Sequence, residues 1–346
     1  MAAHFKSLGL AADFVVLQAR GDYLEAAGEV GSIVDLRVKR LRQAVWPLAR
    51  YLRRERPDAI LCAMWPLNVI AIWARALARV QTRLVISEHN TLSLAAEATK
   101  SLGAHFLKPT IRWFYPSADH VVAVSTGVAQ DLLQIGRLDN GKISVIYNPV
   151  IGEDFDDRTM DQPNPGIQGE GGPLVLSVGS LKPQKDYPTL LRAFAQVRSA
   201  RPARLMILGE GQLRGDLEAL ARELGIEADV TMPGFVANPY PYMKRADLFV
   251  LSSAWEGFGN VIVEALACGT PVVSTDCQSG PAEILDGGKY GALVPVGDPQ
   301  ALAQAMLSAL DSPHDRAALT ARGYDFTVER AASQYIDLLL PGFQSR

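Results

Sequence analysis

The chain contains little cysteine and lacks a long apolar run. Its three cysteines, Cys62, Cys268 and Cys277, are odd in number and lack the spacing of zinc ligands, so we expect neither a disulfide framework nor a cysteine-based metal centre. The longest uncharged apolar stretch, residues 59–74, contains proline and asparagine and is shorter than the roughly 18 residues of a membrane-spanning helix. The first residues lack the apolar core of a secretory signal. We therefore expect a cytoplasmic protein, at most peripheral to the inner face of a membrane.

A large excess of charge is also absent, because the net charge of the 346 residues is −3. The two halves differ, since residues 1–150 hold 18 of the 34 Lys and Arg but only 12 of the 37 Asp and Glu. Cations concentrate between Arg37 and Arg56, interleaved with aliphatic and aromatic residues, which predicts a basic amphipathic helix. Such a helix could contact an anionic membrane surface or pack on a sheet with a solvated outer side. No recognised nucleic-acid-binding module accompanies it, so nucleic acid is not an expected partner.

Short strand-like runs alternate with helical patterns, which is typical of parallel sheets in α/β folds. We predict strands at residues 13–17, 59–62, 83–87, 120–124 and 142–146 in the first half, and at 173–178, 204–208, 230–232, 248–251 and 271–274 in the second. Residues 152–172 are rich in Gly, Pro, Asp and Asn and have no apolar period, which predicts a linker. It would separate a domain of residues 1–151 from one of residues 173–326, and residues 327–346 predict a final amphipathic helix.

The most informative segment is EGFGNVIVE, from Glu256 to Glu264. It follows a buried-strand pattern and leads into a helical one, so Glu256 should lie at the carboxyl end of a strand, where open α/β sheets bind ligands. Gly257 and Gly259 would let backbone N–H groups approach an anion at the helix N-terminus. A ligand touching both carboxylates must be long, with an anion in the middle and hydroxyl groups at each end. A nucleoside diphosphate sugar has this shape.

Further motifs surround this segment. They are SVGSLKPQKDYPTLLRAF at 177–194, LGEGQL at 208–213, PGF at 233–235, ACGTPVVS at 267–274, SGPAEIL at 279–285 and GALVP at 291–295. In this order, and with two glutamates separated by seven residues, they resemble the retaining GT-B glycosyltransferases of family GT4, also called glycosyl transferases group 1. The resemblance covers nearly the whole chain. It implies an α/β protein of two Rossmann-like domains that face each other across a cleft.

The resemblance implies transfer of a hexose or N-acetylhexosamine, with retention, from a nucleotide sugar in which UDP is the expected carrier. The acceptor would be a saccharide or lipid-linked saccharide in cell-surface polysaccharide or glycoconjugate synthesis. No cofactor or metal ion is expected. Lys185, which follows Gly179 and Ser180, would neutralise the diphosphate. The family usually has Arg where this chain has Ser180, so one cation is lost there.

The resemblance also assigns roles to other residues. Glu264 would accept hydrogen bonds from the ribose hydroxyls. Two catalytic residues are expected: Glu256 would hold the transferred sugar near its anomeric carbon, and His89, just past the strand at 83–87, is similar to the cleft histidine of the family.

The turn residues Gly257, Phe258, Gly259 and Asn260 would bring backbone donors to the phosphates and the sugar. Phe235 would border the nucleobase, or else be a core residue.

Other functions are weighed against this one. The GEG segment at 209–211 is half of a dinucleotide-binding fingerprint, but Arg214 replaces its third glycine, which argues against a nicotinamide-dependent oxidoreductase. The alternatives that remain are a catalytically impaired nucleotide-sugar-binding protein and a GT-B-like sugar-nucleotide epimerase. The Asp154-x-Asp156 motif is typical of a pair of metal ligands, but it falls in the predicted linker.

The beginning of the chain departs from the family pattern. Such enzymes usually start with a strand, a Gly-rich loop and a full helix before the segment equivalent to residues 12–17. Here that first strand is missing, so we expect a first domain without its N-terminal strand and a natural reading frame that extends upstream. Loss of a central parallel strand would expose two ladder edges.

Overall fold

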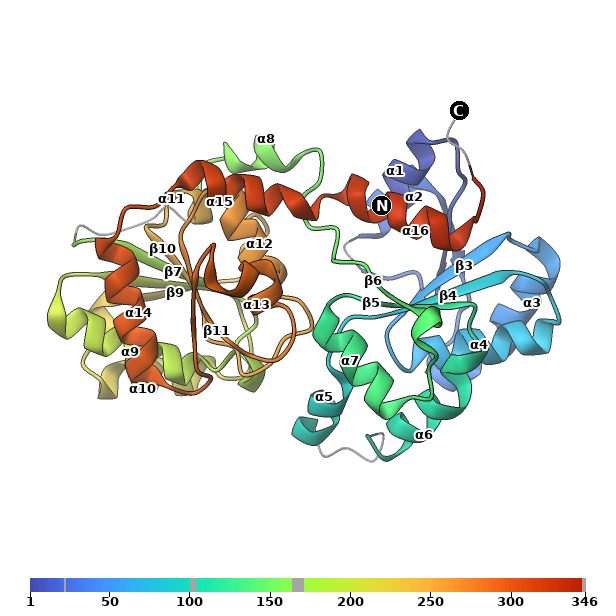
Figure 1. Cartoon of the computed structure of the whole chain (residues 1–346), viewed down its shortest axis with the longest axis horizontal. Helices are drawn as coiled ribbons and strands as arrows, with labels where there is room; N and C mark the ends of the chain where they lie inside the picture. Colours follow the sequence, from blue (N-terminus) through green and yellow to red (C-terminus); the bar gives the residue numbers. More distant parts are fainter. Residues whose placement is uncertain (22, 100–103, 164–170, 344–346) are drawn as a thin grey trace. The chain divides into compact units, whose positions relative to one another are not determined.

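The computed structural model describes residues 1–21, 23–99, 104–163 and 171–343 (Figure 1). It divides into two units, which we describe separately. Unit 1 comprises Met1–Pro149 and Val328–Arg346, and unit 2 comprises Val150–Thr327. Each unit is an α/β assembly of parallel strands and helices, as the alternating sequence pattern predicts.

Unit 2 contains one six-stranded sheet in the order β12-β11-β10-β7-β8-β9. Its strands are β7 (Leu174–Val178), β8 (Arg204–Leu208), β9 (Val230–Gly234), β10 (Leu248–Leu251), β11 (Val272–Thr275) and β12 (Ala292–Val294). Its helices are α8 (Phe155–Thr159), α9 (Tyr187–Ala200), α10 (Arg214–Glu223), α11 (Tyr240–Arg245), α12 (Asn260–Ala267), α13 (Pro281–Ile284), α14 (Pro299–Asp311) and α15 (Arg316–Gly323). Every neighbouring strand pair is parallel, so all carboxyl ends meet at one edge.

The central strands of unit 2 are apolar because helices cover the sheet. All four residues of β10 are buried, as are the first four of β7. One core cluster joins these strands to Leu190 and Phe194 of α9 and to Leu302 and Met306 of α14, all fully buried. This packed layer gives the loops at the carboxyl edge a rigid base.

Unit 1 contains two separate parallel sheets, β1-β2 and β3-β4-β5-β6. Its strands are β1 (Asp13–Val16), β2 (Ser32–Asp35), β3 (Ala59–Ala63), β4 (Arg83–Glu88), β5 (His120–Ala123) and β6 (Ile143–Val145). Its helices are α1 (Ala2–Ser7), α2 (Leu24–Val30), α3 (Val45–Glu55), α4 (Leu67–Ala78), α5 (Leu92–Thr99), α6 (Ala104–Phe114), α7 (Thr126–Ile135) and α16 (Val328–Leu339).

The two sheets of unit 1 are separate in the described part of the chain. Within the described residues, no strand joins β1 to β3. Every residue of β3 is only half-buried, whereas β4 is buried from its second residue to its last. Since β3 borders no further strand in the described part of the chain, its partial exposure is that of an edge strand.

Helix α16 follows unit 2 in the sequence but packs in unit 1. Its apolar side, which includes Ala331, Tyr335 and Leu339, shares a buried cluster with Val85 of β4 and Val122 of β5. The last helix of the chain therefore covers part of one face of the four-stranded sheet (Figure 1).

Two predictions about unit 1 need correction. The basic segment Arg37–Arg56 is not one helix, because Arg37 adopts a left-handed conformation (φ 55°) and α3 begins only at Val45, after a 3-10 turn at Leu41–Ala44. Strand β2 was not predicted. It has only four residues, and just two of them are even half-buried, so it lacks an apolar run.

In unit 2, strand β12 was also missed, because it is a three-residue edge strand. No helix in the described part of the chain is both long and apolar enough to span a bilayer.

Candidate functional site

Two loops of unit 2 meet at the carboxyl edge of its sheet. One follows β7 and carries Lys185, and the other follows β10 and carries Glu256. Because β7 and β10 are neighbours in the sheet, the two side chains meet, and Lys185 Nζ lies 2.6 Å from Glu256 Oε1. Their side chains are only 14% and 9% exposed, so this ion pair is largely shielded from solvent. Two residues that were predicted to have separate roles are thus directly paired.

Hydrogen bonds fix both members of this pair. Ser253 Oγ donates to Glu256 Oε1 (2.7 Å), and Ser252 Oγ donates to the carbonyl oxygen of Lys185 (2.7 Å). Gln184 Nε2 donates to the backbone of the second loop at Trp255 (2.8 Å). Sequence reasoning missed Ser252, Ser253 and Gln184 as site residues. The available signal was a pair of serines directly after a buried strand.

Glycines allow the loops of this edge to approach closely. A Cβ on Gly179 would lie 3.0 Å from Cε of Lys185, so the lysine stem passes directly over this residue. A Cβ on Gly209 or Gly211 would lie 2.0 or 2.4 Å from a backbone oxygen of the loop that begins at Gly179. The GEG segment at 209–211 is therefore explained by packing between adjacent loops, without a dinucleotide.

Helix α12 begins at Asn260, four residues after Glu256. Gly259 is its N-cap, in a left-handed conformation (φ 105°) that favours glycine. Gly257, Phe258 and Gly259 are buried, whereas Asn260 is exposed. The Phe258 ring packs at 5.5 Å against that of Phe326, so its side chain belongs to the core and only its backbone can face a ligand. A helix N-terminus favours anions, which fits the predicted phosphate site.

Glu264 lies one helical turn after Asn260 on α12, about 6 Å further along the axis. Burial raises the pKa of its carboxyl group to about 7, and the nearby Arg158 opposes this rise. Within the described residues, no hydrogen bond or ion pair reaches this carboxylate. A half-buried acid without a partner is costly to the folded protein, so Glu264 is suited to accept hydrogen bonds from a ligand.

Two predicted contact residues of unit 2 are exposed. The Phe235 side chain is 78% exposed and follows Gly234 at the end of β9, so the alternative that it is a core residue is wrong. Ser180 is also exposed and follows Gly179. Both lie at the carboxyl edge of the sheet, where each is open to a ligand.

His89 lies in unit 1, directly after β4, so its position relative to Glu256 is not defined. Its Nε2 atom lies 3.0 Å from Ser87 Oγ, and it also hydrogen bonds to Asn148. Burial lowers its pKa below the ordinary 6.5, and the bond to Asn148 partly opposes this effect. The imidazole is therefore mainly neutral at pH 7.

Glu88, next to His89, is a buried acid that the predicted site did not include. Tyr115 Oη and Asn68 Nδ2 both donate to its Oε1 atom. Its Oε2 atom and Asn68 Oδ1 are buried without a hydrogen-bond partner in the described structure. Burial raises the pKa of Glu88 to about 7, and the bonds from Tyr115 and Asn68 oppose the rise. The signal for this network was weak in the sequence, because its members are 20 and 27 residues apart.

The Asp154-x-Asp156 pair of the predicted linker lies at the start of a short helix. Asp154 is the N-cap residue of α8, and Asp156 accepts a hydrogen bond from Tyr324 Oη. In the described ranges, no group of three or more His, Cys, Asp or Glu side chains is arranged to hold a metal ion.

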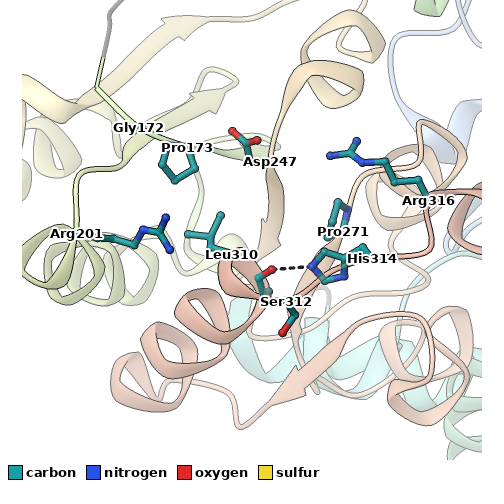
Figure 2. A pocket seen from close by; sticks show the side chains of 10 residues that line it. Gly172, Pro173, Arg201, Asp247, Pro271, Leu310, Ser312, His314 and Arg316 are labelled. Carbon is teal, nitrogen blue, oxygen red and sulfur yellow. Dashed lines mark hydrogen bonds between the residues drawn. The ribbon is translucent and has the colours of Figure 1, made fainter.

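A cavity of about 570 Å³ lies at the opposite edge of the unit 2 sheet, before β7, β10 and β11 (Figure 2). Its lining includes Arg201, Asp247, His314 and Arg316. Several of these groups already have protein partners. Asp247 accepts a backbone N–H at the start of β7, His314 donates to a carbonyl of α14, and Arg201 pairs with the last carboxylate of α14. The cavity is therefore remote from the predicted donor site, and several of its polar side chains already have hydrogen-bond or ion-pair partners within the protein.

Comparison with known proteins supports the resemblance. A family model described as "Glycosyl transferases group 1" matches residues 161–326, and one described as "Glycosyltransferase Family 4" matches residues 1–151. The chain is 31% identical over 241 residues to the lipopolysaccharide core biosynthesis glycosyltransferase LpsE of Rhizobium meliloti, which is 67% of each chain. The chain belongs to glycosyltransferase family 4. The predicted family is thereby confirmed.

The chain is also similar to an N-acetylgalactosaminyltransferase of Campylobacter jejuni that acts on N-acetylgalactosamine-N,N'-diacetylbacillosaminyl-diphospho-undecaprenol. They are 35% identical over 246 residues, which is 70% of this chain and 64% of that relative, or just under two thirds of its length. Among solved structures, HepE of Anabaena in complex with UDP gives a TM-score of 0.73 over 95% of this chain and 91% of that chain. Their identity of 21% shows the fold alone, and the GT-B fold is confirmed.

Proposed function

We propose that this glycosyltransferase transfers a hexose or N-acetylhexosamine from a UDP-sugar to a lipid-linked saccharide, with retention of configuration. The observation that carries the proposal is the arrangement at α12. A shielded Lys185–Glu256 pair lies at the helix N-terminus, and the unpaired Glu264 lies one turn further on. Cation, helix N-terminus and carboxylates are thus spaced for the diphosphate, the sugar and the ribose of one ligand.

The diphosphate would be held by Lys185 and by backbone N–H groups at the start of α12. In the ligand-free protein Lys185 is paired with Glu256, so a bound diphosphate would share or take over this cation. Ser253 would keep Glu256 in place, and the carboxylate could then accept hydrogen bonds from hydroxyls of the sugar. The same lysine would neutralise charge on the departing phosphate.

The nucleoside end would extend along α12. Ribose hydroxyls would donate to Glu264, which has no protein partner in the described structure and would gain two hydrogen bonds. The exposed ring of Phe235 would stack on the nucleobase. The UDP bound to the similarly folded HepE supports uracil as the base.

Transfer would proceed by attack of an acceptor hydroxyl on the anomeric carbon, on the face from which the diphosphate departs. The new glycosidic C–O bond would form as the C–O bond to phosphate breaks, and the acceptor proton would pass to a phosphate oxygen. This route requires neither a protein nucleophile nor a metal ion. His89, neutral at pH 7 and fixed by Ser87 and Asn148, would donate a hydrogen bond to the sugar.

A lipid-linked acceptor would bring the protein to a membrane surface, and the basic segment Arg37–Arg56 would contribute there. On α3, Trp46 is 68% exposed and Arg50 is exposed beside it. Arg53, by contrast, donates to backbone carbonyls at the end of α4, including that of Leu77 (2.9 Å). The diphospho-undecaprenol acceptor in the name of the Campylobacter relative supports this acceptor class.

Thermal unfolding with UDP, GDP, ADP and NAD tests the donor site. A nucleotide at about 100 times its dissociation constant should stabilise the protein by roughly 2.7 kcal/mol. We expect this shift with UDP, and we expect it to vanish in Glu264→Ala. The matched control is Glu223→Ala, an exposed glutamate of α10, which should respond like the wild type. A shift with NAD alone, or an undiminished UDP shift in Glu264→Ala, would contradict the proposal.

A second candidate is a protein that binds the nucleotide sugar without transferring it. The separation of the β1-β2 sheet from β3 favours this candidate, because the acceptor-binding unit lacks a continuous sheet in its described part. Release of UDP from UDP-N-acetylgalactosamine in the presence of lipid-diphosphate saccharides distinguishes the two. Binding of the donor without acceptor-dependent release of UDP would favour the second candidate.

A further inference from the structure

Met64 is an exposed apolar residue in a conformation that its side chain disfavours. It is the first residue after β3, it is 46% exposed, and its backbone is left-handed with φ 69°. Residues other than glycine rarely adopt this region, because the Cβ atom is crowded there. Residues that are nevertheless held in it are concentrated at binding and catalytic sites. Exposure and conformation together therefore indicate that Met64 contacts a ligand.

The Met64 loop lies beside His89 at the carboxyl edge of the four-stranded sheet. Strands β3 and β4 are parallel neighbours, in which Ala63 pairs with Ser87. The pairing continues one residue further, since Met64 N donates to the carbonyl oxygen of Ser87 (2.8 Å). A ligand at the imidazole of His89, two residues after Ser87, would therefore have the Met64 loop as its neighbour.

Buried polar groups hold this loop in place. Asn68 N donates to the carbonyl oxygen of Met64 (3.2 Å), and Asn68 Nδ2 donates to Glu88 Oε1 (2.7 Å). The carboxylate of Glu88 also interacts with the backbone N–H of Trp65. The indole of Trp65 in turn donates from Nε1 to Thr110 Oγ1 on α6 (2.9 Å). The strained residue is thus presented by a loop that is fixed on two sides.

Glu88 is the centre of this support. It is only 1% exposed, and its Oε2 atom has no hydrogen-bond partner in the described structure. A buried acid with an unsatisfied oxygen is costly to the folded protein, so stability alone does not explain its presence. Its contacts to Asn68 and Trp65 give it the role of fixing the loop after β3.

We propose that Met64 contacts an apolar patch of the acceptor saccharide, the C–H face of a pyranose ring or its acetamido methyl group, and that Glu88 positions the Met64 loop. The inference rests on the proposed function, because unit 1 is the acceptor-binding unit in that proposal. The methionine side chain is unbranched and polarisable, so it adapts to an uneven apolar surface. Ligand sites combine such contacts with a few polar groups that fix orientation, here the imidazole of His89.

The surroundings of Met64 favour a sugar over a lipid chain. His89 and the exposed Asn90 follow the neighbouring strand, so the apolar side chain lies beside hydrogen-bonding groups. A polyprenyl chain would require a continuous apolar surface. A sugar presents hydroxyl groups next to C–H groups and matches both.

Initial rates test the contact with the full chain, with UDP-N-acetylgalactosamine as donor and a short-chain polyprenyl-diphosphate N-acetylgalactosamine as acceptor. Met64→Gly removes the side chain and keeps the fold, because glycine adopts φ 69° without crowding. It should raise the acceptor KM about tenfold and leave the donor KM within about twofold of the wild type. Met64→Leu retains an apolar side chain of similar size and should restore most of the acceptor affinity.

Arg79→Gly is the matched control. Arg79 has the same left-handed backbone (φ 55°) in the same unit, but it follows α4 and precedes β4, at the opposite edge of the sheet. Its replacement by glycine should relieve the same crowding and leave both KM values within about twofold of the wild type. An unchanged acceptor KM in Met64→Gly would overturn the inference. An equal rise of the donor and acceptor KM values would also overturn it, since Met64 would then act on something common to both substrates.

Glu88→Ala tests the positioning role. It should raise the acceptor KM about tenfold, because the loop loses its buried hydrogen-bond acceptor. Glu88→Gln can still accept from Tyr115 and Asn68 and should recover most of this affinity. Adding Glu88→Ala to Met64→Gly should cause little further loss, because no Met64 side chain then remains to be positioned. Fully multiplicative losses would overturn the positioning role of Glu88.

Saturation-transfer NMR of the same acceptor saccharide separates this inference from the proposed function. Transfer of magnetisation from the wild type to the saccharide protons, and its loss in Met64→Gly, would support the inference. If the wild type shows this contact but transfers no sugar, the proposed transfer is contradicted and the inference stands. Sugar transfer with an undiminished contact in Met64→Gly would contradict only the inference, and no contact with the wild type would overturn it.

Discussion

Replacing Glu264 by Gln should stabilise the ligand-free protein above pH 7 and remove its response to UDP. In the folded protein, burial raises the pKa of this carboxyl group from 4.5 to about 7. The difference between these values corresponds to roughly 3 kcal/mol of destabilisation once the group is ionised. Because the side chain is half-buried rather than sealed from water, we expect Glu264→Gln to recover about 1 to 3 kcal/mol.

The pH dependence of this effect has a definite sign. Between about pH 4.5 and pH 7 the unfolded chain has lost the Glu264 proton while the folded protein still holds it. The folded state therefore binds more protons, so its stability falls as pH rises through this window and levels off above it. Glutamine does not titrate, and Glu264→Gln should match the wild type near pH 4.5 and exceed it above pH 7.

Urea denaturation from pH 4.5 to 8.5 measures this difference, with Glu223→Gln on α10 as the exposed control. Parallel pH profiles for the wild type and Glu264→Gln would refute the reasoning. Binding of UDP provides a second check. If the ribose hydroxyls donate to the ionised carboxylate, wild-type affinity should fall below pH 7 by up to about tenfold per pH unit. Titration calorimetry of UDP at pH 6 and pH 8 would detect this change.

Three further predictions follow from the same contacts. Lys185→Met leaves Glu256 shielded without its cation and should cost about 3 kcal/mol in urea denaturation. Adding Glu256→Gln should recover most of this loss, and strictly additive losses would show that the two residues are not coupled. Glu88→Gln should match the stability of the wild type near pH 4.5 and exceed it above pH 7, because Glu88 also has a folded-state pKa of about 7. If the variant is instead less stable than the wild type at pH 8, Glu88 is ionised and paired in the folded protein. Ser253→Ala removes a hydrogen bond to Glu256 and should cost about 1 kcal/mol of folding stability. In titration calorimetry, this variant should lose more affinity for a UDP-sugar than for UDP. An equal loss of affinity for both would place Glu256 away from the sugar.

The arrangement of the candidate site was predictable from the sequence where its parts are close along the chain. Glu256, the glycines and Glu264 belong to one loop and one helix, and the local pattern fixes both their order and their spacing. The strands that precede Lys185 and Glu256 were also predicted, because central parallel strands are continuous apolar runs. The strands that were missed, β2 and β12, are short edge strands without such runs.

Contacts between distant segments were not predictable in this way. Lys185 and Glu256 are 71 residues apart, and they meet only because β7 and β10 are adjacent in the sheet. The serines that hold this pair have no distinguishing spacing in the sequence. The network around Glu88 depends on Asn68 of α4 and on Tyr115, which follows α6.

The sequence by itself determined the α/β class and the family, and it predicted a loop–helix segment as the site for a nucleoside diphosphate sugar. These properties are local, because each of them is set by a few neighbouring residues. They are the end of a strand, the conformational freedom of glycine and the spacing of side chains on a helix. Only the tertiary structure decided that Lys185 is paired with Glu256, that no hydrogen bond or ion pair in the described chain reaches the Glu264 carboxylate, and that Phe106 and Trp113 remain exposed. Burial and pairing depend on which elements pack together, and sheet order sets that packing between residues far apart in the chain.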